Sequence, residues 1–343
     1  MKRALLLAVL VLVGCGKVTE VPERDIVVRG GDAVPTREAA DEQSRGVRIA
    51  GARIVFITHG QASDPFWTVV KKGAADAAKQ TGTAVSYRAP DRFSLARMRR
   101  FIDEAVAGGN RPDGLVVSLP DADALKPSIE KAVAAGIPTI TINSGSDRFK
   151  ELGVLAHVGQ PEYEAGVESG KRLARAGVRR ALCVDQESGN HGLDERCRGV
   201  DDALEKAGGG ARVLSVPLQD PVTAQRRMAE AIAGGPVDGI LTLGPGAAQP
   251  ALAAVNASGM TSKITLASFD LSPEVLAAVR AGKMLFAVDQ QPYLQGFLPV
   301  VLLAEQARHK LFPGKGRLIP TGPQFVTKDN AAEVIQLSAE GIR

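Results

Sequence analysis

The sequence predicts an α/β fold with two doubly wound lobes, in which helices cover both faces of a mostly parallel sheet. Short apolar runs rich in β-branched residues alternate with helical segments of about 10–15 residues, the pattern of parallel βαβ units. The alternation starts again after about His157 and runs a second time. With 343 residues, the chain is long enough for two domains of ordinary size.

The first half is expected to form four strands separated by three helices. Ile54-Val55-Phe56-Ile57 is the first β-rich run, and a glycine follows each helical segment, as expected where helices end. The expected elements are strands at 54–57, 85–87, 114–117 and 138–142, and helices at 66–81, 95–107 and 124–135.

The second half repeats this order with more units. It begins with a helix and ends with a long apolar helix at 291–311, after two short units at 273–281 and 285–288. The elements between are helices at 162–176, 193–207, 221–233 and 247–258, and strands at 180–184, 211–216, 239–243 and 263–269.

The N-terminus has the pattern of a bacterial lipoprotein signal. Lys2 and Arg3 precede an apolar run, 4–13, which is too short for the roughly 20 residues of a membrane-spanning helix. Cys15 stands where the mature chain would begin, so residues 1–14 are expected to be removed and Cys15 to be lipidated. The alternative is an ordinary signal with a chance cysteine.

Residues 15–47, rich in charge, Pro and Gly, are expected to form a flexible stalk.

Charge and motifs exclude several function classes. The net charge is only +4 and no Lys/Arg run is longer than a pair, which argues against nucleic acid as a partner. Neither a G-x-x-x-x-G-K-[ST] phosphate loop nor a G-x-S-x-G elbow occurs. The four histidines do not cluster, and the cysteines fit no zinc pattern. We therefore expect no enzyme, no cofactor and no metal.

Cys183 and Cys197 remain after the lipidation site is set aside. An exported protein sits where disulfides form and persist, so a bridge between them is one interpretation. The other is a pair of small buried hydrophobic residues.

The candidate site consists of polar and aromatic residues at strand ends. Asp64-Pro65-Phe66-Trp67 follows the first strand and combines a carboxylate with two aromatic planes, which suit the faces and hydroxyls of a sugar ring. The simpler reading is a helix cap with two core aromatics. Arg196 lies early in a helix, where a cation suits the helix dipole poorly and a ligand or a surface ion pair would explain it. Further polar residues that follow strands are Ser118, Asn143, Ser144, Asp270 and Gln290.

At these residues the chain resembles the ribose-binding-protein-like class of periplasmic solute-binding proteins, the receptors of ABC importers for simple sugars. The resemblance covers about residues 52–327 and includes the segments 108–120 and 136–138. Four further motifs carry it: Asp64-Pro65-Phe66-Trp67, Arg196-x-x-Gly199, Ser268-Phe269-Asp270 and Gln290-Gln291-Pro292. In that family the aromatics stack on the sugar, the arginine binds ring and hydroxyl oxygens, and the aspartate accepts hydroxyl hydrogens.

The chain also departs from the family pattern. Asn143-Ser144 replaces an Asp-Arg pair, and Gly244 replaces a common Asn or Asp. A longer first loop adds His59 and Gln61 near the mouth of the cleft. The specificity for ribose is therefore not carried over.

The resemblance implies a type I periplasmic binding protein with two lobes and a three-segment hinge. The expected crossings lie near Val158-Gly159, Gln290–Pro292 and Gly316-Arg317. The expected lobes are 48–158 with 292–317 and 159–291 with 318–343.

The implied function is capture of a sugar or polyol by hinge closure and delivery to an ABC permease. The protein is then a monomer held at the membrane by its lipid anchor, in the periplasm or at the cell surface. A receptor for a chemoreceptor or histidine kinase is the alternative, which neighbouring genes would distinguish.

Overall fold

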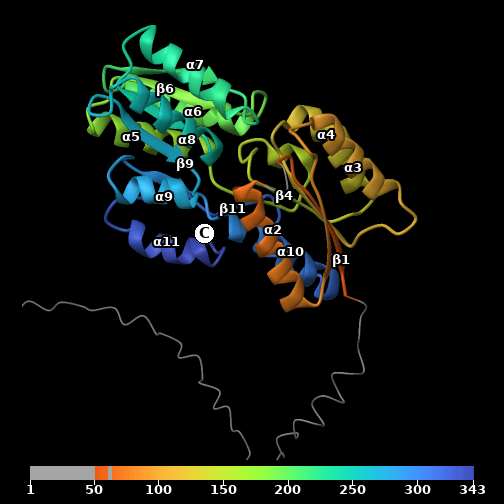
Figure 1. Cartoon of the computed structure of the whole chain (residues 1–343). Coiled ribbons are helices and arrows are strands. Elements are labelled where there is room, and N and C mark those ends of the chain that lie inside the picture. Colours follow the sequence, from red (N-terminus) through yellow and green to blue (C-terminus); the bar gives the residue numbers. More distant parts are fainter. Residues whose placement is uncertain (1–50, 61–63) are drawn as a thin grey trace, which may run out of the picture. The chain divides into compact units, whose positions relative to one another are not determined.

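The computed structural model describes residues 51–60 and 64–343, which form two six-stranded sheets with helices packed on them (Figure 1). The expected signal peptide, the lipidation site Cys15, the stalk and Gln61 lie outside the described residues. In the part of the chain that is described, no helix combines the length and apolar character needed to cross a membrane.

The first sheet has the strand order β11-β5-β4-β3-β1-β2, and all of its strand pairs are parallel. Its strands are β1 (Arg53–Ile57), β2 (Ala84–Arg88), β3 (Gly114–Ser118), β4 (Thr139–Ile142), β5 (Ala156–Gly159) and β11 (Arg317–Pro320). We call this sheet and its helices the first lobe.

The second sheet has the order β12-β10-β9-β8-β6-β7, in which only β12 runs antiparallel to its neighbour. Its strands are β6 (Arg180–Asp185), β7 (Gly210–Ser215), β8 (Gly239–Thr242), β9 (Thr265–Phe269), β10 (Ala287–Asp289) and β12 (Gln324–Val326). This sheet and its helices form the second lobe. The two strand orders correspond position by position, which confirms the predicted fold of two doubly wound lobes.

The sheet of the first lobe buries apolar side chains on both of its faces. Alternate residues of β3 divide between the two faces: Val116 joins one core, and Leu115 and Val117 join the other. The first core contains α2 (Pro65–Thr81) and α10 (Pro292–His309); the second contains α3 (Leu95–Ala107), α4 (Ala122–Ala134) and the short 3₁₀ helix η2 (Phe149–Leu152). Figure 1 shows α2 and α10 side by side, although they are far apart in sequence.

The second lobe is built in the same way. One face of its sheet packs on α5 (Glu162–Arg175) and α6 (His191–Glu205). The other packs on α7 (Pro221–Ala233), α8 (Pro245–Ala257), α9 (Pro273–Arg280) and α11 (Ala331–Ala339). A disulfide joins Cys183 of β6 to Cys197 of α6 in the core between the sheet and helices α5 and α6.

The third crossing between the lobes differs from the expected one. β11 still pairs with β5 in the first sheet, whereas β12 belongs to the second, so the chain changes sheet at 321–323. The predicted lobe boundary between 317 and 318 is therefore too early. β11 is an edge strand of four residues that ends at Pro320 and is only partly buried. Such a strand gives little apolar signal in sequence.

Candidate functional site: a cavity between the two sheets

A cavity lies where the carboxyl ends of strands from both lobes meet. The space between its lining atoms is about 440 Å³, including the part open to solvent. The lining residues are His59, Asp64, Phe66, Trp67, Asn143, Gln186, Glu187, Asn190, Leu193, Arg196, Leu218, Leu243, Gly244, Pro245, Gly246, Asp270 and Gln290. Strand ends of two facing parallel sheets are the expected place for a ligand site in this architecture.

Most of the predicted site residues line this cavity. Those that do are Asp64, Phe66, Trp67, Asn143, Arg196, Asp270 and Gln290, together with His59 and Gly244. Ser118 and Ser144 do not line it. The Ser118 hydroxyl bonds His59 through the backbone N–H and through Nδ1, each at 2.9 Å, and the Ser144 hydroxyl bonds Asn143 Oδ1 at 3.2 Å. These two serines therefore form hydrogen bonds with residues that line the cavity, His59 and Asn143, without lining it themselves.

The start of α2 forms an aromatic wall of the cavity. Asp64 caps the helix, because its Oδ1 accepts the backbone N–H of Phe66 at 2.9 Å. Phe66 and Trp67 meet edge to face with ring centroids 5.0 Å apart, and both also belong to the first core. Asp64 therefore caps the helix and the two aromatic rings pack in the core, as the simpler interpretation expects. All three residues also line the cavity. Burial raises the pKa of Asp64, although backbone N–H groups of Phe66 and Trp67 act against this.

Arg196 is held by a buried carboxylate of the second lobe. Its Nε and Nη2 donate to Glu162 Oε2 and Oε1 at 2.6 and 3.0 Å, and both side chains are at most 3% exposed. The guanidinium also lies 4.6 Å from the ring centre of Phe269. Burial would lower the pKa of Arg196, but the charge and hydrogen bonds of Glu162 outweigh it and raise this pKa. The Nη1 group has one long bond of 3.4 Å, to the Leu243 carbonyl, and Arg196 is among the residues that line the cavity.

Gly199, the glycine of the Arg196-x-x-Gly199 motif, has a packing role. A Cβ at this position would lie 2.2 Å from the carbonyl oxygen of Tyr163 on α5. α5 and α6 therefore approach so closely that only glycine fits, and this contact fixes the helix that carries Arg196.

Two lining residues hold a strained backbone at equivalent strand ends of the two sheets. Asn143 follows β4 with φ 64°, and Asp270 follows β9 with φ 62°. The left-handed region is uncommon for residues other than glycine, and such strain gathers at functional sites. Gln290 connects the two residues: its Oε1 accepts from Asn143 Nδ2 at 3.1 Å and its Nε2 donates to Asp270 Oδ1 at 2.6 Å. Burial raises the pKa of Asp270 to about 7, against the opposing charge of Arg196.

His59 of the first lobe contacts Glu187 and Asn190 of the second lobe. Its Nε2 lies 3.4 Å from Glu187 Oε2 and 3.4 Å from Asn190 Nδ2. Burial acts to raise the pKa of Glu187, but hydrogen bonds from His59 and Asn190 and the charge of Arg196 lower it overall. These residues connect the lobes at the cavity wall.

Glu187, Asn190 and Gln186 are lining residues that the sequence analysis missed. They follow β6, which ends at Asp185, one residue later than expected. The rule used elsewhere, polar residues directly after an apolar strand, also applies to this loop and would have found them.

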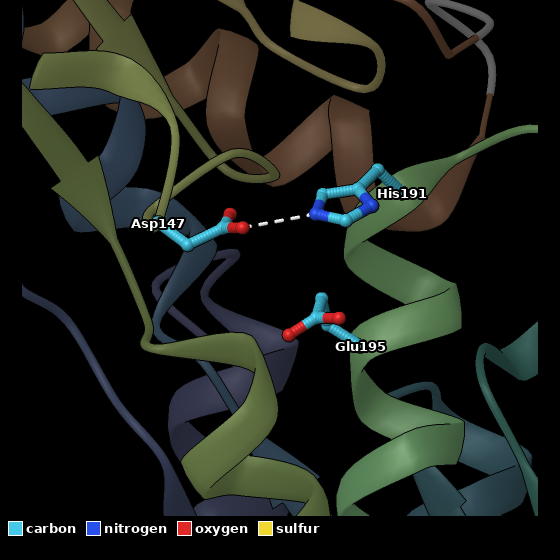
Figure 2. A group of neighbouring side chains, drawn as sticks. All are labelled: Asp147, His191 and Glu195. Carbon is cyan, nitrogen blue, oxygen red and sulfur yellow. Dashed lines mark hydrogen bonds and ion pairs between the residues drawn. The ribbon is translucent and has the colours of Figure 1, made fainter. Parts of the chain in front are cut away.

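A second contact between the lobes lies outside the cavity (Figure 2). His191 Nε2 is 2.9 Å from Asp147 Oδ2, and the His191 backbone N–H donates to the Pro120 carbonyl at 2.8 Å. Glu195 lies one turn along α6, so three ligand atoms of metal-binding type come within 4.8 Å of one another. Both oxygens of Glu195 are already bound by Arg198, however. We therefore assign His191 and Asp147 as a hydrogen-bonded pair between the lobes, with Glu195 held by Arg198 on its own helix.

Comparison with known proteins agrees with this architecture. A family model described as a periplasmic binding protein domain matches residues 54–311. The chain belongs to this family. The match begins in β1 and extends just past α10, so it includes strands of both sheets.

Similar proteins carry names of sugar-binding or carbohydrate-transport proteins. The xylose/arabinose-binding protein of Sulfolobus acidocaldarius is 24% identical, over 81% of this chain and 71% of the relative. The D-allose-binding periplasmic protein of Escherichia coli is 24% identical over 78% of this chain and 88% of its own. A carbohydrate transporter from Acidothermus cellulolyticus, solved in complex with myo-inositol, is 35% identical with a TM-score of 0.79, covering 85% of this chain and 100% of that structure.

Proposed function

We propose that the protein is an extracytoplasmic receptor that binds a monosaccharide or a cyclic polyol between its lobes and delivers it to an ABC importer. The observation that carries this proposal is the lining of the cavity: aromatic faces from α2 beside carboxylate, amide and guanidinium groups at strand ends of both sheets. The family membership and the sugar and myo-inositol ligands named for relatives support it.

The lining chemistry suits a neutral ring that carries several hydroxyl groups. Asp64 and Asp270 accept hydroxyl hydrogens, and Arg196 Nη1 donates to hydroxyl or ring oxygens. Asn143 can accept through Oδ1, and Gln290 can donate the second hydrogen of its Nε2 group. Phe66 and Trp67 offer apolar surface for the C–H face of the ring. A few charge-assisted hydrogen bonds and one stacked ring account for micromolar affinity, about 8 kcal/mol.

The lobes are proposed to close over the ligand by a hinge at the three crossings. The contacts His59–Glu187 and His191–Asp147 join residues of different lobes and would break in an open form. Closure excludes water from the cavity and so strengthens each polar contact with the ligand.

The site of action is proposed to be outside the cytoplasm, at a membrane surface. The family supports an extracytoplasmic location, and the N-terminal sequence supports lipidation at Cys15. Mass spectrometry of the N-terminal peptide from the native host tests the anchor: a diacylglyceryl mass on Cys15 is expected, and an unmodified peptide that retains residues 1–14 would contradict it.

Isothermal titration of the purified protein against pentoses, hexoses, myo-inositol and other cyclic polyols tests the binding function. At least one compound is expected to bind with micromolar or tighter affinity. The matched control is Glu230→Gln, which changes an exposed side chain of α7 far from the cavity and from the contacts between lobes, and should leave the binding unchanged. Absence of binding across the panel would overturn the proposal.

A further inference from the structure

Gln295 is a fully buried amide that lies behind the cavity. It is 0% exposed, on the first turn of α10, directly after the second crossing between the lobes. It is not among the residues that line the cavity. Its side chain nevertheless forms hydrogen bonds with Asn143, Gln290 and Thr321. Its Nε2 lies 3.1 Å from the Gln290 carbonyl, 2.9 Å from Gln290 Oε1 and 3.2 Å from Thr321 Oγ1.

These bonds set the direction of the amides that line the cavity. Gln295 Oε1 accepts from Asn143 Nδ2 at 3.3 Å, while Gln290 Oε1 accepts from both Asn143 and Gln295. Because its oxygen is fixed by two donors, Gln290 must point Nε2 the other way, toward Asp270 Oδ1 at 2.6 Å. The amide of Gln290 therefore has one allowed orientation.

The network also reaches the hinge. Asn143 belongs to the first lobe, Asp270 to the second, Gln290 to the second crossing and Thr321 to the third. Gln295 bonds both the second crossing, at Gln290, and the third crossing, at Thr321. Buried polar networks of this kind hold a single arrangement when every member is satisfied.

We propose that Gln295 is a positioning residue, which fixes the donor and acceptor pattern that Asn143, Gln290 and Asp270 offer to the ligand and ties that pattern to the third crossing through Thr321. The expected effect on ligand affinity rests on the proposed function. The orientation of the amides, in contrast, can be tested without any ligand.

The first measurement uses the ligand-free protein. In ¹⁵N-labelled wild-type protein, the side-chain amide protons of Asn143 and Gln290 are expected to exchange slowly with water. In Gln295→Met, which keeps the approximate shape and removes the amide, their exchange is expected to be at least 10-fold faster. The control is Gln306→Met on the same helix. Fast exchange in the wild type, or no change in Gln295→Met, would overturn the proposal even if no sugar binds.

The second measurement uses the ligand found by titration. Gln295→Met is expected to weaken affinity by about 10-fold or more at a temperature where the variant is folded, whereas Gln306→Met should bind as the wild type. In an Asn143→Ala background the same change should have a much smaller effect, because Gln295 acts through Asn143 and Gln290. Full, independent effects of the two substitutions would show a purely structural role.

Thr321→Val, a milder change, should weaken binding less than Gln295→Met. Wild-type affinity in both variants would contradict the proposal.

Discussion

Arg196 lines the cavity and is also part of a buried ion pair. Because Arg196 is paired with Glu162, the charge of the guanidinium that lines the cavity is balanced by a carboxylate of the same lobe. The position of Arg196 early in a helix indicated a partner other than the helix dipole. The identity of that partner did not follow from sequence, because Glu162 lies in a different helix, 34 residues away.

Arg196→Ala is expected to lose ligand binding and also to destabilise the fold. The substitution leaves the Glu162 carboxylate buried without its partner, which typically costs about 3–5 kcal/mol. Arg196→Met with Glu162→Gln removes both charges and should recover most of the stability but not the binding. Urea unfolding and calorimetry measure the two effects separately. Equal stability of Arg196→Ala and the double variant would show that the pair is not buried as described.

If Asp270 binds the ligand as proposed, the affinity is expected to depend on pH. Its pKa is raised to about 7 by burial, so the carboxyl is mostly protonated below pH 6 and mostly ionised above pH 8. The ionised form is the stronger acceptor for ligand hydroxyls, so affinity should rise by about 10-fold from pH 6 to pH 8. His59, Asp64, Glu187 and Arg196 also line the cavity.

Asp270→Asn distinguishes Asp270 from these neighbours. The variant should bind weakly at every pH, with the rise between pH 6 and pH 8 removed. Calorimetry in buffers of matched ionic strength is the measurement. A rise that persists in Asp270→Asn would assign the titration to another group of the cavity.

At the scale of elements, the sequence predicted those with strong apolar and capping signals. The helix at 95–107 and the helix at 221–233 have the predicted bounds, because Ser94 and Asp220 cap their starts and glycines follow their ends. β5 was not predicted as a strand: it has only four residues and carries His157, a buried histidine bonded to Thr141 and to the Asn143 carbonyl. A strand that buries a polar side chain lacks the apolar pattern from which strands are predicted, so β5 could not be predicted from the sequence.

The disulfide between β6 and α6 is an element-scale constraint on the second lobe. It links residues separated by 14 positions, and a bridge over a loop of this length typically stabilises a protein by about 2–4 kcal/mol. Cys183→Ala with Cys197→Ala should therefore lower the urea midpoint, and reductant should lower that of the wild type but not of the variant. A wild-type midpoint that reductant leaves unchanged would show that the bridge contributes little.

At the scale of the whole molecule, the repeated βαβ pattern predicted the two lobes, and the strand ends predicted six of the seventeen residues that line the cavity. The contacts between lobes were not predictable, because they join residues such as His59 and Glu187 that are 128 positions apart and have no shared sequence signal. The crossing at 321–323 was missed for a related reason: a short edge strand depends on its neighbour for its structure.

The capture of a ligand between the lobes is tested most directly by small-angle X-ray scattering of the purified protein, with and without the ligand identified by calorimetry. The account predicts a smaller radius of gyration when ligand is present, because the lobes close over it and form the His59–Glu187 and His191–Asp147 contacts. Identical scattering curves at saturating ligand would contradict it.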